Sequence, residues 1–527
     1  MFIIRQKEGR KQALLYAKKK RYNESMSKNT LEVGPDHHLT PKLVSEVAHN
    51  PKAKVILSPR AKKKILASRR VVERIVRQRK VVYGITTGFG SFKDTFIEKE
   101  DVRELQRNLI RSHSSGVGRN LSPEMVRAAM LVRLNSLAQG YSGVRLEFLE
   151  FLVTLINRNI VPVVPSQGSV GSSGDLAPLS HIGLVMMGEG EVWQKGKVVN
   201  AATVLKKARL SPPGFMEKEG LAFNNGTSVM TGIAAVAFHK AEHLVEIADL
   251  GASLTLEAVC GITKAYDPRV QNIRFQPGQT IVAKNIRDYI KGSKLVDTMP
   301  ERVQDSYSLR CVPQVHGAIR DALRYVRGVV EGELNSVTDN PLIFTNPDEA
   351  ISGGNFHGEP IALAMDMLGI ALAELADIAE RRIAKLIDPT MNGGLPIFLI
   401  PKEKGGLHNG LMIPQYVAAS LVSENKVLAH PASVDSIPTS VNQEDHVSMG
   451  TIAARKAWEI ILNTENVLAI EYLNATQAID MRDPKKLGEG TKKAYRAIRK
   501  KTSFIKSDRI LAKDIEKVRE VLLEMEV

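Results

Sequence analysis

The segment VPVVPSQGSVGSSGDLAP (161–178) constrains the fold more than any other part of this chain. Its prolines and glycines do not continue a helix, and its small residues allow two backbone segments to approach closely. Apolar residues recur at helical spacing over about 41–80 and 100–160 before it, and over 226–265 and 315–335 after it. The pattern predicts helices around a loop of unusual local structure.

A helix is predicted most clearly over residues 361–387, because apolar residues recur there every three or four positions. One face carries Ile361, Met365, Leu368, Leu372 and Leu375, and the opposite face carries Asp366, Glu374, Asp377 and Glu380. Long helices of this kind pack together as a bundle. The predicted fold class is therefore mainly α, with loops rich in Gly, Asn and Pro at 223–228, 351–360, 391–410 and 431–443.

The formal net charge of +16 raises the question of a nucleic-acid partner. Residues 1–80 contain 22 Lys and Arg against 6 Asp and Glu, whereas the remaining 447 residues contain 51 of each. A phosphate-binding groove in the main fold would need Lys and Arg along its surface. We therefore expect no nucleic acid partner, and we predict that Lys18–Arg21 and Lys62–Lys64 coat a solvated N-terminal surface, with an anionic partner as the alternative.

The sequence was compared with three features of membrane and secreted proteins, namely a transmembrane stretch, a signal peptide and a cysteine framework. The longest apolar stretches, such as 361–373, contain an acidic residue, so no transmembrane helix is expected. The first residues, MFIIRQKEGRKQ, place four apolar residues before the basic ones, the reverse of a signal peptide, so we expect a cytoplasmic protein. Cys260 and Cys311 are the only cysteines and form no CxxC, which supports neither a disulfide framework nor a thiolate metal cluster.

Familiar hydrolytic and metal-binding motifs do not account for the polar loops. GSSGD (171–175) lacks the glycine at position 175 that a nucleophile elbow requires. HGE (357–359) is not followed by the P-C-x-x-C of zinc deaminases. NQEDHVSM (442–449) offers contiguous carboxylates and a histidine, whose side chains point in different directions, so no metal site is expected. What remains is Ser173 beside Gly174, where a missing side chain lets an amide approach a neighbouring carbonyl closely enough to cyclise.

The string GSVGSSGDLAPLSH (168–181) resembles the signature of the aromatic amino acid lyases, the family of the histidine and phenylalanine ammonia-lyases. Members of this family cyclise an Ala-Ser-Gly triplet into 4-methylideneimidazol-5-one (MIO), an electrophile that needs no added cofactor. The resemblance implies that Ser173 loses water and that the Gly174 nitrogen attacks the Ser172 carbonyl. Ser172 stands where Ala is usual, but its side chain becomes a ring substituent, so cyclisation is expected to survive.

Other motifs are similar to the same family over roughly residues 40–520. YGITTGFG (83–90) makes Tyr83 the candidate base for the substrate β-proton. A phenol with a pKa near ~10 needs a positive local potential for this role. LAFNNGTS (221–228) makes Asn225 a ligand of the MIO or of the substrate amine region.

The resemblance assigns further residues in three more loops. QDSYSLRCVPQVHG (304–317) makes Gln304 a polar contact, Tyr307 a second catalytic phenol and Arg310 the guanidinium that pairs with the substrate carboxylate. SGGNFHGEP (352–360) places Phe356 beside the MIO. NQEDHVSM places Glu444 near the substrate side chain or amine.

The loop RSHSSGVG (111–118) bears on the substrate. Ser112-His113 resembles the histidine-acting branch of the family, in which His113 would hydrogen-bond a substrate imidazole. A buried carboxylate such as Glu444 is unfavourable beside an apolar ring but has a partner beside imidazole. The resemblance thus implies elimination of ammonium from L-histidine to give urocanate, a step of histidine catabolism. Elimination from tyrosine or phenylalanine and a 2,3-aminomutase reaction are the alternatives.

The resemblance also implies the architecture. We expect a basic segment (1–40), an N-terminal domain with the MIO loop (41–222), a central helical bundle (223–483) and a C-terminal helical segment (484–527). Family members are homotetramers whose active sites take loops from three subunits. The scatter of the predicted site residues from 83 to 444 suits such an assembly.

Overall fold

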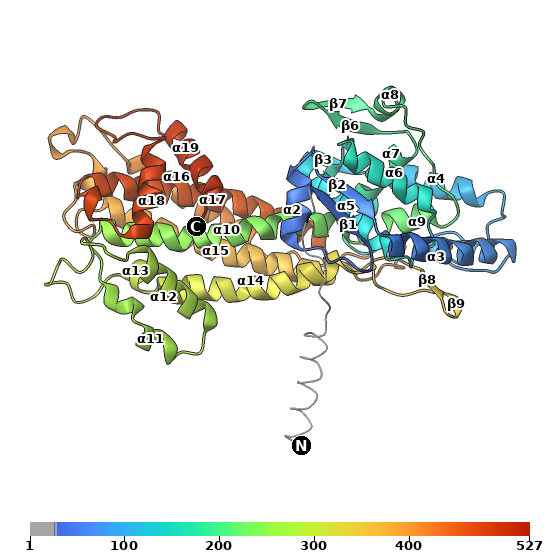
Figure 1. Ribbon diagram of the computed structural model, residues 1–527, viewed down its shortest axis with the longest axis horizontal. Coiled ribbons are helices and arrows are strands. Elements are labelled where there is room, and N and C mark those ends of the chain that lie inside the picture. The colour runs from blue at the N-terminus through green and yellow to red at the C-terminus, as the bar shows by residue number, and fades with distance from the viewer. Residues whose placement is uncertain (1–25, 27–28) are drawn as a thin grey trace, which may run out of the picture. The chain divides into compact units, whose positions relative to one another are not determined.

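The computed structural model describes residue 26 and residues 29–527 (Figure 1). The run Lys18–Arg21 and most of the predicted basic segment 1–40 lie outside the described residues. The chain divides into two units, and both combine segments that are far apart in the sequence. The first unit comprises Met1–Val236, Val330–Glu359 and Asp435–Thr451, and the second comprises Ala237–Val329, Pro360–Val434 and Ile452–Val527. The fold is mainly α, as the sequence predicts.

Short and medium helices form most of the first unit. They are α2 (Pro41–His49), α3 (Pro59–Arg77), α4 (Val102–His113), α5 (Pro123–Ala138), α6 (Leu146–Asn157), α7 (Leu176–Met186), α8 (Ala201–Lys207) and α9 (Glu219–Asn224). Helices α2, α3 and α5 begin in the same way, with the side chain of Thr40, Ser58 or Ser122 accepting a backbone N–H and a proline following it. Such a cap followed by proline favours a helix start at these positions.

Short strands complete the first unit. β1 (Thr30–Val33) pairs in parallel with β2 (Lys54–Leu57). The antiparallel pairs are β3 (Val117–Asn120) with β5 (Pro165–Gln167), β4 (Val161–Pro162) with β6 (Glu191–Gln194), β6 with β7 (Lys197–Asn200), and β8 (Leu342–Thr345) with β9 (Asp348–Ile351). Buried residues of α3, including Val72 and Ile75, pack with Ile85 and Ile343, so the β8–β9 hairpin joins the core.

Lys62, Lys63 and Lys64 lie on α3. The Lys62 ammonium lies 3.0 Å from a carboxylate oxygen of Glu150, and the Lys64 ammonium donates a hydrogen bond of 3.3 Å to the Tyr141 hydroxyl. Two of the three lysines therefore have partners within the first unit, which favours a protein surface over a dedicated anion site.

Four long helices and several shorter ones form the described part of the second unit. The shorter helices include α11 (Pro268–Asn272), α12 (Pro277–Tyr289), α13 (Tyr307–Arg310), α16 (Met412–Leu428), α18 (Glu489–Arg499) and α19 (Ala512–Glu524). Most residues of α10 (Ser228–Ala258), α14 (Val312–Leu334), α15 (Glu359–Ile387) and α17 (Gly450–Asp480) also belong to it. None of the helices in the described part of the chain is long and apolar enough to cross a membrane.

Helix α15 confirms the helix predicted over 361–387. All five residues of the predicted apolar face are buried, and Glu374 and Asp377 of the opposite face are exposed. Asp366 and Glu380 are buried instead. The Asp366 carboxylate accepts the backbone N–H of Ser433 at 2.7 Å, and the Glu380 carboxylate accepts the side-chain amide of Gln415 at 2.7 Å.

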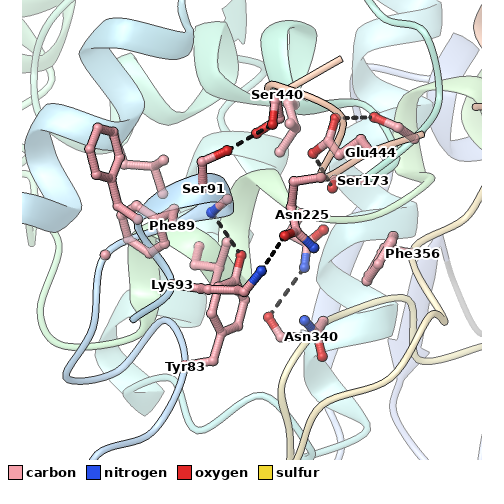
Figure 2. Close-up of a pocket in the computed structure, with 18 of the residues that line it drawn as sticks. Tyr83, Phe89, Ser91, Lys93, Ser173, Asn225, Asn340, Phe356, Ser440 and Glu444 are labelled. Atoms are coloured by element: carbon pink, nitrogen blue, oxygen red, sulfur yellow. Dashed lines mark hydrogen bonds between the residues drawn. The ribbon is translucent and has the colours of Figure 1, made fainter. Parts of the chain in front are cut away.

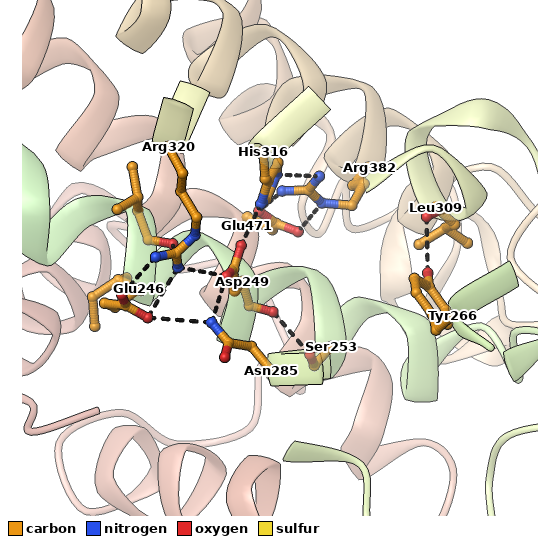
Figure 3. Close-up of polar contacts among 12 residues, drawn as sticks. Glu246, Asp249, Ser253, Tyr266, Asn285, Leu309, His316, Arg320, Arg382 and Glu471 are labelled. Atoms are coloured by element: carbon orange, nitrogen blue, oxygen red, sulfur yellow. Dashed lines mark hydrogen bonds and ion pairs between the residues drawn. The ribbon is translucent and has the colours of Figure 1, made fainter. Parts of the chain in front are cut away.

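Buried charges join α10, α14, α15 and α17 within the second unit (Figure 3). Arg382 of α15 donates to both carboxylate oxygens of Glu471 of α17, at 2.5 and 2.9 Å. Asp249 of α10 lies 2.7 Å from Nδ1 of His316 and 2.5 Å from the guanidinium of Arg320, both on α14. Loss of one partner would leave an uncompensated buried charge, so these contacts help to fix which helix faces meet.

Candidate active site

The loop that ends at Asp175 forms the centre of the candidate site. The Asp175 carboxylate is fully buried and accepts the backbone N–H groups of Val229 and Met230, at 2.9 and 2.8 Å, at the start of α10. It also accepts the hydroxyls of Ser169 and Thr451. Burial raises the pKa of Asp175 above its ordinary value, because these hydrogen bonds only partly offset desolvation.

Gly174 has a left-handed backbone with φ +68° and lies directly against Gly226. A Cβ atom on Gly174 would lie 2.1 Å from the carbonyl carbon of Gly226. The Gly226 N–H donates to the Ser173 carbonyl at 3.1 Å, and the Asp175 N–H donates to the Gly226 carbonyl at 2.8 Å. Only glycine fits at position 174, and the backbone on either side of it is held in place.

The surroundings of this loop fit the small polar ring that the sequence predicts. The Asn225 side-chain amide donates to the Asn340 carbonyl at 3.2 Å, whereas its Oδ1 is buried without a hydrogen-bond partner among the described residues. The Ser169 hydroxyl donates to the Gly174 carbonyl at 3.2 Å. The glycine cradle and the donors to the Ser173 and Gly174 carbonyls suit a ring formed from residues 172–174, because both carbonyls remain after cyclisation. The buried amide oxygen of Asn225 can only accept, so it calls for a separate donor in the site.

A cavity of about 1100 Å³ in the first unit opens onto this loop (Figure 2). Its lining brings together predicted site residues from six separate segments, namely Tyr83, His113, Ser172, Ser173, Asn225, Phe356 and Glu444. Gly174 lies behind this surface, in the backbone contact with Gly226. The roles assigned to these residues remain predictions.

Gln304, Tyr307 and Arg310 belong to the second unit rather than to the lining of this cavity. Gln304 is exposed, and Tyr307 is 70% exposed. The Arg310 guanidinium lies 4.6 Å from the centre of the Tyr307 ring. These two side chains form a cation–π pair at the surface of their own unit.

Three hydroxyl groups surround the carboxylate of Glu444. Ser173 donates to Oε1 at 3.0 Å, whereas Ser172 and Thr439 donate to Oε2 at 2.8 and 2.7 Å. Figure 2 shows the Glu444 carboxylate beside Ser173. The sequence motif predicts the glutamate but not this division of its partners between the two oxygens.

Tyr83 and His113 are both half-buried in the cavity wall. Burial raises the pKa of Tyr83, the N–H that Gly90 donates to the phenol oxygen at 3.3 Å opposes this, and the charge of Glu444 raises the pKa further. Burial lowers the pKa of His113, so its imidazole is neutral at pH 7. The positive local potential expected for Tyr83 is therefore not supplied by these neighbours.

Comparison with known proteins decides the family. A sequence model of the aromatic amino acid lyases matches residues 39–500. The chain belongs to the aromatic amino acid lyase family. A relative from Caldanaerobacter subterraneus, named histidine ammonia-lyase, is 54% identical over 480 residues, which cover 91% of this chain and 94% of the relative.

Solved structures of aromatic amino acid lyases and related enzymes share this fold. The crystal structure of histidine ammonia-lyase from Trypanosoma cruzi matches with a TM-score of 0.87 at 40% identity, covering 93% of each chain. That of tyrosine aminomutase from Streptomyces globisporus matches with a TM-score of 0.89 at 38% identity, covering 94% of this chain and 97% of the other. Backbone shape therefore does not separate a lyase from an aminomutase.

Sequence reasoning missed several polar residues of this aromatic amino acid lyase site. Asp175, Asn340 and Thr439 make hydrogen bonds to the loops described above but received no role from the sequence. Asp175 was within the matched motif, and its place directly after the triplet was a usable signal. Asn340 contacts Asn225 from a distant segment, which the sequence does not reveal, whereas Thr439 contacts Glu444 within one loop, five residues away. Among the described residues, no group of three or more His, Cys, Asp or Glu side chains could hold a metal ion.

Proposed function

We propose that this chain is an ammonia-lyase that converts L-histidine to urocanate and ammonium. The observation that carries the proposal is the presence of a neutral His113 and the carboxylate of Glu444 in the wall of one cavity, since both can pair with an imidazole ring. The likeness to relatives named histidine ammonia-lyase, at 51–55% identity, supports the same substrate.

The electrophile of this reaction is proposed to be MIO, formed from Ser172, Ser173 and Gly174. Such a group supplies an acceptor for electron density, which makes the loss of a poor leaving group such as ammonia feasible. The residues that would hold it are Gly226, whose N–H donates to the Ser173 carbonyl, and Ser169, whose hydroxyl donates to the Gly174 carbonyl. The unsatisfied amide oxygen of Asn225 would instead accept a hydrogen bond from the substrate ammonium group.

Three side chains of the cavity would handle the substrate. Neutral His113 can hydrogen-bond the substrate imidazole, and Glu444 can bind its other nitrogen or receive a proton. Tyr83 would take the β-proton. Its raised pKa opposes this role in the free chain, but a substrate ammonium group near the phenol would lower that pKa again.

We assign Gln304, Tyr307 and Arg310 to the site of an assembled homotetramer, in which a neighbouring subunit brings them to the cavity. Arg310 would then bind the substrate carboxylate with two parallel hydrogen bonds. The Arg310 side chain is half-buried beside the exposed ring of Tyr307, which supports a role at a surface between subunits. Light scattering of the purified protein measures the oligomeric state, and a stable, active monomer would contradict this assignment.

A product assay tests the proposed function. Purified protein is incubated separately with L-histidine, L-tyrosine and L-phenylalanine, and urocanate, coumarate, cinnamate, free ammonium and β-amino acids are measured. We expect urocanate and an equal amount of ammonium from L-histidine. A β-amino acid without free ammonium would identify an aminomutase, and coumarate or cinnamate without urocanate would identify the other lyase branch.

The variant His113→Leu tests the residue that carries the substrate assignment. Leucine cannot hydrogen-bond an imidazole, so kcat/KM for L-histidine should fall by about tenfold or more relative to kcat/KM for L-phenylalanine. His49→Leu, which changes an exposed histidine on α2, is the control and should keep the wild-type ratio. An unchanged ratio in His113→Leu would assign imidazole recognition to other residues.

A further inference from the structure

Ser172 and Thr439 hold one oxygen of the Glu444 carboxylate, and Ser173 holds the other. Ser172 and Thr439 donate to Oε2, at 2.8 and 2.7 Å, and Ser173 donates to Oε1 at 3.0 Å. The Ser172 side chain is 4% exposed, so it has little water to replace this bond. The two oxygens of one carboxylate thus depend on different hydroxyl groups.

Ring formation would remove only one of these three donors. The Gly174 nitrogen bonds to the Ser172 carbonyl carbon, whose oxygen leaves as water with the amide hydrogens of Ser173 and Gly174. The Ser173 hydroxyl leaves as a second water with the Ser173 α-hydrogen. The Ser172 hydroxyl takes no part in either step and remains after both.

We infer that Ser172 is a positioning residue, whose hydroxyl together with that of Thr439 anchors Oε2 of Glu444 while cyclisation frees Oε1 for the substrate. The inference rests on the proposed function, because it gives Glu444 a substrate to meet. An alanine at position 172, which is usual in the family, has no such hydroxyl. This chain therefore has a second anchor on a carboxylate that Thr439 alone would otherwise hold.

Two anchors on one oxygen predict a specific kinetic pattern. A hydrogen bond to a charged group stabilises it by roughly 1.5–3 kcal/mol. Because two hydroxyls donate to the same oxygen, the remaining one still holds that oxygen after the other is removed, so each single loss is smaller. Ser172→Ala and Thr439→Val should each lower kcat for L-histidine only about fivefold to tenfold. The double variant should lose clearly more than the product of the two, roughly several hundredfold, because neither anchor remains.

The experiment compares these three variants with the wild type and with Ser68→Ala. Ser68 is a buried serine of α3 whose hydroxyl donates to the Ile65 carbonyl, so this control removes a hydroxyl without touching Glu444. Four quantities are measured: kcat, KM, the ultraviolet absorbance of the MIO and Tm. We expect kcat to fall while KM changes less than about twofold and the absorbance persists.

The outcomes separate this inference from the proposed function. If the wild type makes no urocanate, the proposed function fails, and the same kinetic cycle is run on the substrate that the protein does use. If Ser172→Ala has wild-type kcat both alone and in the Thr439→Val background, the positioning role is wrong. Loss of absorbance in Ser172→Ala would also overturn it, because Ser172 would then act in cyclisation rather than in holding Glu444.

Discussion

Asp175 in the first unit and Asp249 in the second are both fully buried carboxylates, but their partners differ in kind. Asp175 accepts two backbone N–H groups and two hydroxyls, all of them neutral donors. Asp249 accepts hydrogen bonds from His316, Asn285 and the charged guanidinium of Arg320. Burial acts on both in the same direction, so the difference between them comes from these partners.

The pKa values of the two groups shift in opposite directions. Burial raises the pKa of Asp175, and its neutral donors do not reverse this. Burial also acts to raise the pKa of Asp249, but the hydrogen bond from His316 and the charge of Arg320 outweigh it, so the pKa falls. Neutral donors therefore leave the buried Asp175 carboxyl easier to protonate, whereas the charged partner of Asp249 keeps that carboxylate ionised.

Ser173→Ala should have the largest effect, because it removes the hydroxyl that cyclisation consumes. We expect nearly all turnover and the ultraviolet absorbance of the MIO to disappear. The fold should persist, since the Ser173 side chain donates to Glu444, which retains Ser172 and Thr439 as donors. Circular dichroism and light scattering check the fold. Full activity of this variant would contradict the assignment of the electrophile to a ring formed from Ser173.

Tyr83→Phe should lower kcat by about 10²- to 10⁴-fold, the usual contribution of a positioned acid–base group. The ring is kept and only the phenol oxygen is lost, so Tm and the MIO absorbance should stay at wild-type values. Tyr141→Phe is the matched control, because the Tyr141 hydroxyl accepts a hydrogen bond from Lys64 outside the cavity. Equal rates for the two variants would rule out Tyr83 as the base.

Arg382→Met tests how much the buried ion pairs of the second unit stabilise the fold. It leaves Glu471 as a buried carboxylate without its main partner, which should lower the free energy of unfolding by roughly 3–5 kcal/mol. Denaturant unfolding measures this loss. Arg269→Met is the control, because the Arg269 side chain is 91% exposed and its ion pair with Asp267 should contribute less than about 1 kcal/mol. Similar losses of unfolding free energy in both variants would show that the buried ion pair stabilises the fold no more than an exposed one.

Particular residues show what the sequence could predict. The apolar period of 361–387 predicts α15, because a long amphipathic helix carries its own signal. The strands have two to four residues each, too few for a period of two to stand out. The family motifs predict Tyr83, Ser173 and Glu444 as site residues, and all three line one cavity. Periodicity places Asp366 and Glu380 on the polar face together with Glu374 and Asp377, but the first two are buried and the last two are exposed. Their burial depends on the partners Ser433 and Gln415, which lie on other segments.

Acid titration gives the smallest expected effect and addresses His316 directly. Burial lowers the pKa of His316, and Asp249 only partly offsets this, so the imidazole is neutral in the folded chain. Below about pH 6.5 the unfolded chain binds a proton at this histidine that the folded chain does not bind. The unfolding free energy should therefore fall as the pH drops from 7 to 5, by at most about 1.4 kcal/mol per pH unit from this group.

His316→Asn should flatten that slope, because asparagine can still donate to Asp249 but does not titrate. His49→Asn, which replaces an exposed histidine, should keep the wild-type slope. If His316→Asn and the wild type lose stability equally between pH 7 and 5, the acid sensitivity comes from other groups, with His113 and His181 of the first unit next in line because burial lowers the pKa of both.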